Sequence, residues 1–274
     1  MATLLLLLVS IGSAQHTRVQ QHMGTLCEIE AYGTQDDISA AFEEIARWDR
    51  ALSHYKKDSE LALALSDAYL FPRVVSPMME EALRESIRLK KETNGLFDVG
   101  YRSTRSARDG VQVENGRLRL VPGGTIDFGG IGKGLALDHA ARVLRERGVT
   151  AARMNFGGHI YALGSPPETE GWVVRAEALG RTVVLHDASI AISADSEQPG
   201  HIWDPRAGRA AHRRGAYAAI MPTGTDADGW TKALYLAGRA PAAFPGCGLL
   251  PDGRSAGDCS RFAVKSTDEE LVHE

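Results

Sequence analysis

The sequence has no block of basic residues, which removes one broad class of function from consideration. Its 31 lysines and arginines are outnumbered by 35 aspartates and glutamates, which gives a formal net charge of −4. Proteins that bind nucleic acids usually gather lysine and arginine on one face, because contacts to the phosphate backbone supply much of their affinity. We therefore expect no nucleic-acid partner.

Long apolar runs are also scarce. The most pronounced one, TLLLLLVSIGSAQ near the N-terminus, is shorter than the ~20 residues that a membrane-spanning helix needs. It ends in Gly12, Ser13 and Ala14, and small residues after an apolar run are typical of a secretory signal. We expect residues 1–14 to be a signal peptide cleaved near Gln15, and the protein to be exported, periplasmic or inner-membrane-associated. A buried first strand or helix is the alternative.

Cysteine is rare as well. The three cysteines are Cys27, Cys247 and Cys259. A cysteine-based metal site needs more ligands at closer spacing, so we expect none. Cys247 and Cys259 could form a disulfide if the protein occupies an oxidising compartment.

Apolar residues at helical spacing predict several helices, over residues 36–52, 77–94, 132–147 and 227–237. Ser76, followed by a proline, suits the start of the second helix, because serine caps free N–H groups and proline fits the first turn. Gly148 suits the end of the third. The stretch LSHYKKDSEL at residues 52–61 reads as a loop.

Alternating or apolar runs predict strands, at residues 27–31, 172–177, 182–187 and 189–194. Asn-Gly at 115–116 and Gly-Gly at 157–158 predict turns between further short strands. No segment repeats at a fixed period. Because strands lie both between helices and in a run of their own, we favour an α+β fold over a doubly wound parallel sheet. We expect mixed or antiparallel sheets flanked by helices, with residues 16–274 forming a single domain.

The stretch DFGGIGKG at residues 127–134 resembles a phosphate-binding loop but fits neither common type. Lys133 is not followed by the Ser or Thr of a Walker P-loop, and the glycine spacing of the dinucleotide fingerprint is absent. Glycines still allow close backbone approach, a following helix N-terminus favours anions, and Lys133 adds positive charge. With Asp127 as a hydrogen-bond acceptor, the set suits a nucleotide or a flavin. The alternative is a turn that only lets strand and helix pack closely.

Two other clusters carry residues with chemical potential. His201, in HIWDPRAGR, is either structural or suited to acid–base work. Asp226 and Asp228 lie near a predicted helix start, where aspartate often serves as a cap. Together with Thr231 they also offer the oxygen ligands that magnesium prefers.

These stretches resemble, in order, the motifs of the ApbE family of FAD:protein FMN transferases. The resemblance runs from about Met23 to Gly238 and is carried by MGTLCEIEAYG, LSHYKKDSEL, GLFDVG, DFGGIGKGLALDHAARVLRERGV, NFGGHIYALG, HIWDPRAGR and ADGWTKALYLAG. It implies an ApbE-like fold and an enzyme that binds FAD with Mg²⁺. Such an enzyme transfers FMN to a Thr hydroxyl of an acceptor flavoprotein and releases AMP.

The resemblance also implies a set of site residues. The positions that would contact FAD are Met23, Tyr55, Leu96, Phe97, Asp98, Asp127, Lys133 and Ile202. His201 would activate the acceptor hydroxyl. The metal would be held by the Gly130 carbonyl, by Asp228 and by a hydroxyl after it, here Thr231.

Three positions depart from the family pattern. Lys232 stands where the family usually has Thr, so that either Thr231 takes over or the Lys232 ammonium occupies the place of a cation. The segment FDVGYRSTRSARDG replaces a Thr-Val-Gly-Pro-Leu continuation, and His159 stands where Asp or Asn is commoner. Two rival functions therefore stay open, an FAD pyrophosphatase that uses water and a flavin-binding protein without catalysis.

Overall fold

The computed structural model describes residues 14–107, 109–194 and 200–266, so nearly all of the expected signal peptide lies outside the described residues. The helices are α1 Gln35–Leu52, α2 Glu60–Leu65, α3 Pro77–Glu92, α4 Gly132–Glu146 and α5 Gly224–Ala237, with short 3-10 turns at Arg105–Ala107 and Glu177–Leu179. The strands are β1 Gln15–His22, β2 Thr25–Tyr32, β3 Arg73–Val74, β4 Val111–Glu114, β5 Arg117–Leu120, β6 Ala152–Phe156, β7 His159–Leu163, β8 Trp172–Ala176, β9 Arg181–Leu185, β10 Ala188–Ala194, β11 Trp203–Asp204, β12 Arg209–Ala210, β13 Ala216–Met221, β14 Cys247–Leu249, β15 Ser255–Gly257 and β16 Ala263–Ser266.

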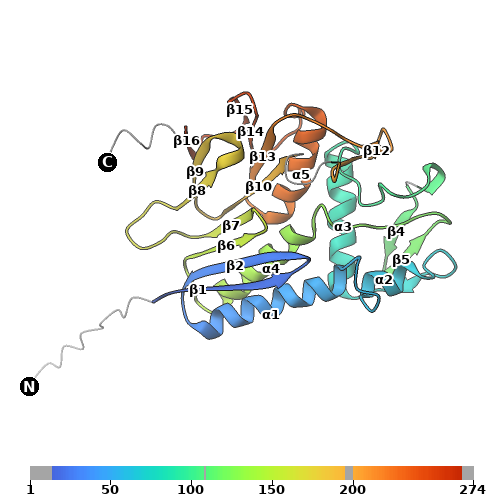
Figure 1. The fold of residues 1–274 in the computed structure, drawn as a ribbon. Helices are drawn as coiled ribbons and strands as arrows, with labels where there is room; N and C mark the ends of the chain where they lie inside the picture. Colours follow the sequence, from blue (N-terminus) through green and yellow to red (C-terminus); the bar gives the residue numbers. More distant parts are fainter. Residues whose placement is uncertain (1–13, 108, 195–199, 267–274) are drawn as a thin grey trace, which may run out of the picture.

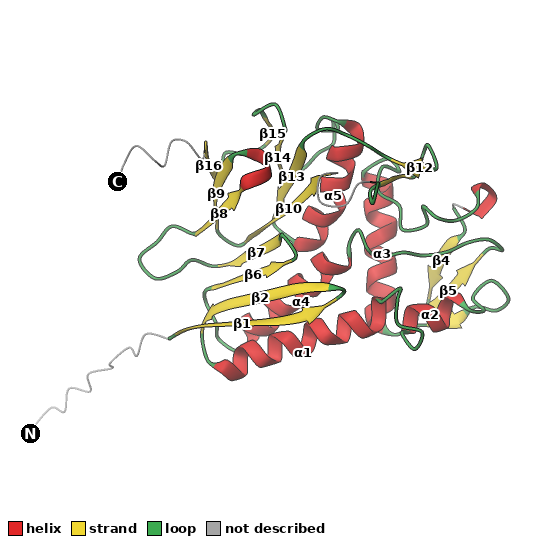
Figure 2. Cartoon of the chain, in the orientation of Figure 1, coloured by secondary structure: helices red, strands yellow, loops and turns green. Residues whose placement is uncertain are grey.

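An 8-stranded sheet runs through the molecule in the order β1-β2-β6-β7-β10-β13-β14-β15 (Figure 1). Each neighbouring pair in it is antiparallel. Two 3-stranded sheets accompany it, β16-β9-β8 and β3-β5-β4, the second of which lies at the edge of the molecule beside α2 (Figure 2). The expected α+β class with antiparallel sheets and flanking helices is therefore confirmed.

Strand β13 shows how the layers are arranged. Ala219 and Met221 belong to the main core, together with residues of α1, α4 and α5. Ala218 and Ile220 belong to a second core, which they share with Trp172 of β8 and residues of β9. Side chains alternate between the two faces of a strand. The large sheet is therefore covered by helices on one face and by the β16-β9-β8 sheet on the other.

The helix starts follow from local sequence. Thr34 caps α1, and Asp37 returns the interaction by accepting the Thr34 N–H at 2.8 Å, which makes a capping box. Ser76 caps α3 by accepting the Met79 N–H at 3.2 Å, as predicted. Gly148 follows α4 with a φ of +84°, a backbone conformation that favours glycine.

Several expectations about element bounds were wrong. Helix α5 begins at Gly224 rather than at residue 227, because Thr223 is its cap. Helix α3 ends at Glu92, before Asn94 and Gly95 turn the chain with positive φ. The expected loop at 52–61 contains the start of the short α2.

The hairpins at 115–116 and 157–158 are confirmed, and two further features complete the fold. Cys247 and Cys259 form a disulfide, whereas Cys27 is a free, buried thiol in β2. Over the part of the chain that the structure describes, no helix is both long and apolar enough to cross a bilayer.

Candidate functional site

The glycine-rich loop is held in shape by Asp127. Its carboxylate accepts the Gly129 N–H at 2.8 Å and the Tyr101 hydroxyl at 2.7 Å. The loop then turns into α4, where the Gly132 N–H donates to the Phe128 carbonyl at 2.7 Å. Lys133 follows in the first helical turn, half-buried, and within the described residues it makes no hydrogen bond or ion pair. An unpaired ammonium at a helix N-terminus suits an anionic ligand.

Helix α5 brings a second charged group to the same place. Asp138, in the second turn of α4, accepts the backbone N–H groups of Gly224 and Thr225 at 2.6 and 2.9 Å, which ties the start of α5 to α4. One turn along α5, the carboxylate of Asp228 lies only 1% exposed and accepts the Gly134 N–H at 3.3 Å. A buried carboxylate therefore already lies at the N-terminus of α4.

Asp228 has two further neighbours. The Lys232 ammonium, one turn later on α5, donates to Asp228 Oδ1, and its side chain is 21% exposed. His159 Nδ1 lies 3.6 Å from Asp228 Oδ2, while His159 Nε2 bonds to Ser189 Oγ at 2.9 Å. Two of the departures from the family pattern, Lys232 and His159, thus meet at the same carboxylate.

The charges of these groups are mutually dependent. Burial alone would raise the pKa of Asp228, but the positive charges of Lys232 and Lys133 outweigh it and hold that pKa well below its usual range. Burial lowers the pKa of Lys232, and the Asp228 carboxylate opposes that shift. Asp228 is therefore an anion whose negative charge depends on a lysine partner.

The other carboxylate of this region, Asp226, has a structural role. Its N–H donates to the Thr223 hydroxyl at 3.1 Å, and its side chain accepts from that hydroxyl at 2.8 Å. Arg88 of α3 pairs with it at 2.5 Å. Asp226 thus completes the Thr223 cap of α5 and ties the helix to α3.

Two of the residues expected to contact FAD pack around the glycine loop. Met23 lies in the β1–β2 turn, and its Sδ is 3.9 Å from the position that a Cβ on Gly132 would take. Phe97 is buried, with its ring 3.1 Å from the corresponding position on Gly130. Both side chains therefore border the loop that carries Lys133.

The neighbours of Phe97 form the wall beside it. Leu96 is partly buried against the main core. Asp98 pairs with Lys90 at 2.9 Å and accepts the Gly100 N–H at 2.8 Å, and a hollow of about 180 Å³ lies beside it. Tyr55, in contrast, is 91% exposed on the loop after α1, and its ring packs edge-on against the neighbouring His54.

His201 is exposed and stands immediately before the buried Ile202. The next residue, Trp203, packs on Tyr101 with the ring centroids 6.0 Å apart, and Tyr101 is the residue that bonds to Asp127. The segment that carries His201 is thus tied to the glycine loop through two aromatic side chains. Neither residue was predicted from the sequence, although Tyr101 directly follows GLFDVG and Trp203 lies within HIWDPRAGR.

The three expected metal ligands are not arranged around an open position. The Lys232 Cε lies 3.8 Å from where a Cβ on Gly130 would be, so the lysine lies between Gly130 and Asp228. The Thr231 hydroxyl donates to the Tyr217 carbonyl of β13 at 3.1 Å. The described residues contain no group of three or more His, Cys, Asp or Glu side chains placed to hold a metal ion. Mg²⁺ demands several oxygen ligands around one position, and the Lys232 side chain between Gly130 and Asp228 does not fit that demand.

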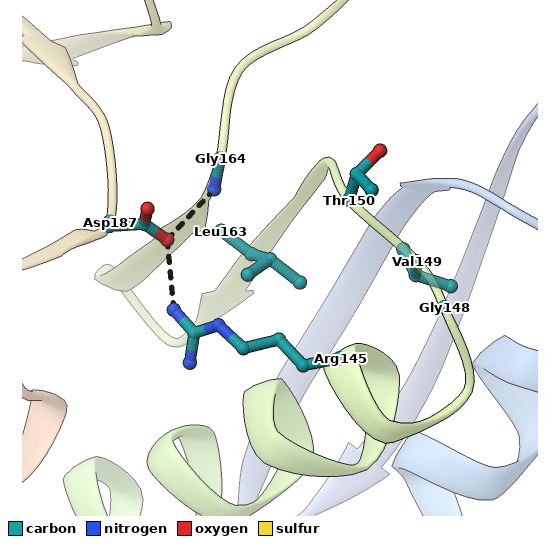
Figure 3. A pocket seen from close by; sticks show the side chains of 7 residues that line it. All are labelled: Arg145, Gly148, Val149, Thr150, Leu163, Gly164 and Asp187. Atoms are coloured by element: carbon teal, nitrogen blue, oxygen red, sulfur yellow. Dashed lines mark hydrogen bonds and ion pairs between the residues drawn. The ribbon is translucent and has the colours of Figure 1, made fainter.

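A hollow of about 280 Å³ lies elsewhere, at the other end of α4 (Figure 3). Arg145 and Asp187 line it and pair with each other at 2.8 Å, and the Gly164 N–H also donates to Asp187. At 1.5 Å per residue, Arg145 is about 18 Å along the helix from Lys133. Because its charged groups satisfy each other, this hollow offers no equivalent chemistry.

Comparison with known proteins identifies the family of the chain. The model of the ApbE family matches residues 23–108 and 100–243. A protein of Klebsiella pneumoniae (strain 342) named FAD:protein FMN transferase is 25% identical over 268 residues, covering 79% of this chain and 77% of its own. One of the same name from Treponema pallidum (strain Nichols) is 25% identical over 325 residues, covering 91% and 89%.

Solved structures show the same fold. The flavin transferase ApbE from Vibrio cholerae superposes with a TM-score of 0.76 at 20% identity, covering 94% of this chain and 99% of that one. The ApbE protein from Thermotoga maritima gives a TM-score of 0.78 at 18% identity, covering 90% and 98%. With the family model spanning most of its length, the chain belongs to the ApbE family.

Proposed function

We propose that this protein is an FAD:protein FMN transferase. It moves FMN from FAD to the hydroxyl of a Thr residue in an acceptor flavoprotein, and AMP leaves. Relatives that carry this name cover about four fifths of the chain, which supports the reaction class. The observation that carries the proposal is Lys133, an unpaired ammonium in the first turn of α4 beside the Asp228–Lys232 pair. Such a site complements a diphosphate.

FAD binding follows from the neighbours of that site. The diphosphate would lie at the N-terminus of α4 against Lys133. Met23 and Phe97 would contact the apolar parts of the dinucleotide, since both border the glycine loop. The aromatic pair Tyr101 and Trp203 offers a stacking surface next to His201.

The chemical step exchanges one P–O bond for another. A neutral His201 takes the proton from the Thr hydroxyl, and the Thr oxygen bonds to the phosphorus of the FMN half. The bond from that phosphorus to the bridging oxygen breaks, and its electron pair leaves with AMP. Phosphoryl transfer depends mainly on positioning and on neutralising charge, which Lys133, Lys232 and the helix N-terminus would supply.

Mg²⁺, expected from the family resemblance, stays a prediction that the site geometry disfavours. A lysine lies between two of the three expected ligands and forms an ion pair with one of them, Asp228. We therefore write no step through a metal ion.

The reaction is tested by incubating the protein with FAD and a Thr-containing acceptor peptide. Transfer adds the mass of FMN to the peptide. Hydrolysis of FAD to free FMN and AMP would instead support the pyrophosphatase alternative, which the exposure of His201 to water makes chemically accessible. FAD binding without any product would identify a flavin-binding protein.

Export and processing belong to the same proposal. The Cys247–Cys259 disulfide supports an oxidising compartment, where such bonds persist. Protein recovered from the native host should then begin near Gln15. Recovery of the intact N-terminus in the cytosolic fraction would contradict export.

A further inference from the structure

We propose that the Lys232 ammonium supplies the fixed positive charge of the site, so that the protein transfers FMN without a divalent metal ion. The inference rests on the proposed function, because it concerns how the same diphosphate is neutralised. It begins from the disagreement between the expected magnesium ligands and the side chains that lie there.

The first observation is that both oxygens of Asp228 already have partners. Oδ1 accepts from Lys232, and Oδ2 accepts the Gly134 N–H at 3.3 Å with His159 Nδ1 at 3.6 Å. The residue is only 1% exposed. A divalent ion at Oδ1 would have to displace the Lys232 ammonium, because two cations at the same carboxylate oxygen repel each other.

The second observation concerns the other two expected ligands. The lysine stem lies against Gly130, with Cε 3.8 Å from the position of a Cβ there. The Thr231 side chain is fully buried and donates its proton to the Tyr217 carbonyl. Residues three apart on a helix are neighbours on its surface, so Thr231 lies one turn from Asp228, but its hydroxyl oxygen is held 3.1 Å from the β13 carbonyl of Tyr217.

The third observation is the balance of charge. Lys133 and Lys232 both act on Asp228, so two positive charges oppose one negative charge before any ligand binds. A divalent cation would be repelled by both ammonium groups, whereas a diphosphate would be attracted. The site therefore suits an anion that binds the two ammonium groups directly, with no metal ion between the anion and the protein.

Lys232 could serve only as a structural partner of Asp228, or it could take the place of a metal ion in the reaction. Two variants of Lys232 distinguish these roles. Lys232→Thr introduces the family's usual residue and an oxygen ligand. Lys232→Met keeps the apolar stem and adds no ligand. Thermal unfolding of both variants shows whether they are folded, and the remaining readouts compare folded protein only.

The first measurement is FMN attachment to the acceptor peptide in EDTA and in Mg²⁺. The wild type should react at the same rate, within about twofold, in both. Because a fixed charge at the reacting group contributes on the order of 10²-fold, Lys232→Thr should lose about that factor in EDTA and recover it in Mg²⁺. Lys232→Met should lose it in both. A wild type that stops in EDTA and recovers with Mg²⁺ would overturn the inference.

The second measurement does not need turnover. Binding of Mn²⁺ to the FAD-loaded protein is followed by loss of the free-ion electron paramagnetic resonance signal. Lys232→Thr should bind about one ion, and the wild type none in the same range. Equal binding by both would overturn the inference. If neither the wild type nor the variants attach FMN under any condition, the proposed function fails. The Mn²⁺-binding comparison then decides by itself whether Lys232 excludes a metal ion.

Discussion

Gly134 of α4 and Gly224 of α5 lie so close that a Cβ on Gly134 would be 2.3 Å from the Gly224 carbonyl oxygen. Real Cβ atoms do not approach a backbone oxygen to this distance. The two helix starts can therefore meet only through glycine at both positions. Their contact is what sets Asp228 beside Lys133.

Gly134→Ala should push the helices apart. Overpacking of this kind typically costs ~1–3 kcal/mol in the free energy of unfolding, and here it should also displace Asp228 from the Gly134 N–H. Chemical denaturation measures the first effect and FAD titration the second. Gly132→Ala is the matched control, since its Cβ would meet Leu52 and Met23 at ordinary distances of 3.8 and 3.9 Å. Equal stability of the two variants would contradict this reading of the contact.

The sequence predicted the helices of the site well but not how closely they meet. The spacing of apolar residues predicted correctly that α4 begins at Gly132, and Gly148 predicted that the helix ends just before it. The close contact of Gly134 with Gly224 joins residues far apart in the chain, and no local pattern reports such a contact. Strand β13 was missed for a related reason. Both of its faces are buried, so AYAAIM shows no alternation of apolar and polar residues.

The candidate site divides in the same way. The motifs identified Lys133, Asp127 and Asp228, because each stands in a recognisable stretch. They did not show that Lys232 reaches the Asp228 carboxylate, since a side chain at this spacing can equally point to solvent. Nor did they show the contact between Tyr101 and Trp203, which depends on tertiary packing.

The cysteines should react in three distinct steps. Burial raises the pKa of the Cys27 thiol to about 12, with Glu28 adding to the effect, so the native protein should not react with Ellman's reagent at pH 8. In denaturant without reductant one thiol per chain should react. After reduction in denaturant and removal of the reductant, all three should react, since the other two form the disulfide. Three reactive thiols in denaturant alone would contradict the Cys247–Cys259 bond.

Asp37 should make the fold sensitive to acid. The Thr34 N–H donated to its carboxylate holds the pKa of Asp37 below its usual range, with burial opposing and Arg147 assisting. A lowered folded pKa stabilises the protein above the unfolded value near 4, and that stability is lost as the pH falls through the folded pKa.

The comparison that tests this is between wild type and Asp37→Asn. Helix caps contribute ~0.5–2 kcal/mol, so the wild type should be more stable by about 1 kcal/mol at pH 7. The difference should shrink as the pH falls below 4 and through the lowered folded pKa of Asp37, where that carboxyl becomes protonated and both side chains are uncharged. Denaturation curves across this range give the result, and a difference that does not change with pH would show that Asp37 acts through shape alone.

Lys133→Ala should weaken FAD binding without unfolding the protein. A charge-assisted hydrogen bond contributes ~1.5–3 kcal/mol, which corresponds to roughly a 10- to 100-fold loss of affinity. Lys133 makes no hydrogen bond or ion pair with the described residues, but its charge helps to keep Asp228 ionised, so the Lys133→Ala protein should stay folded with a somewhat lower melting temperature than the wild type. Lys91→Ala, on the exposed face of α3, is the control for a simple change in net charge. Titration calorimetry with FAD decides, and equal affinity of all three proteins would remove Lys133 from the site.

The most direct test of the central claim is to measure AMP release and FMN attachment together, by chromatography and by intact mass. With FAD and a Thr-containing acceptor, the wild type should release one AMP for each FMN bound to the peptide. A peptide with Ala in place of that Thr should gain no mass. His201→Ala should still bind FAD but attach FMN ~10²–10⁴-fold more slowly, as expected on losing a general base. AMP released together with free FMN, and a peptide that stays unmodified, would contradict the account.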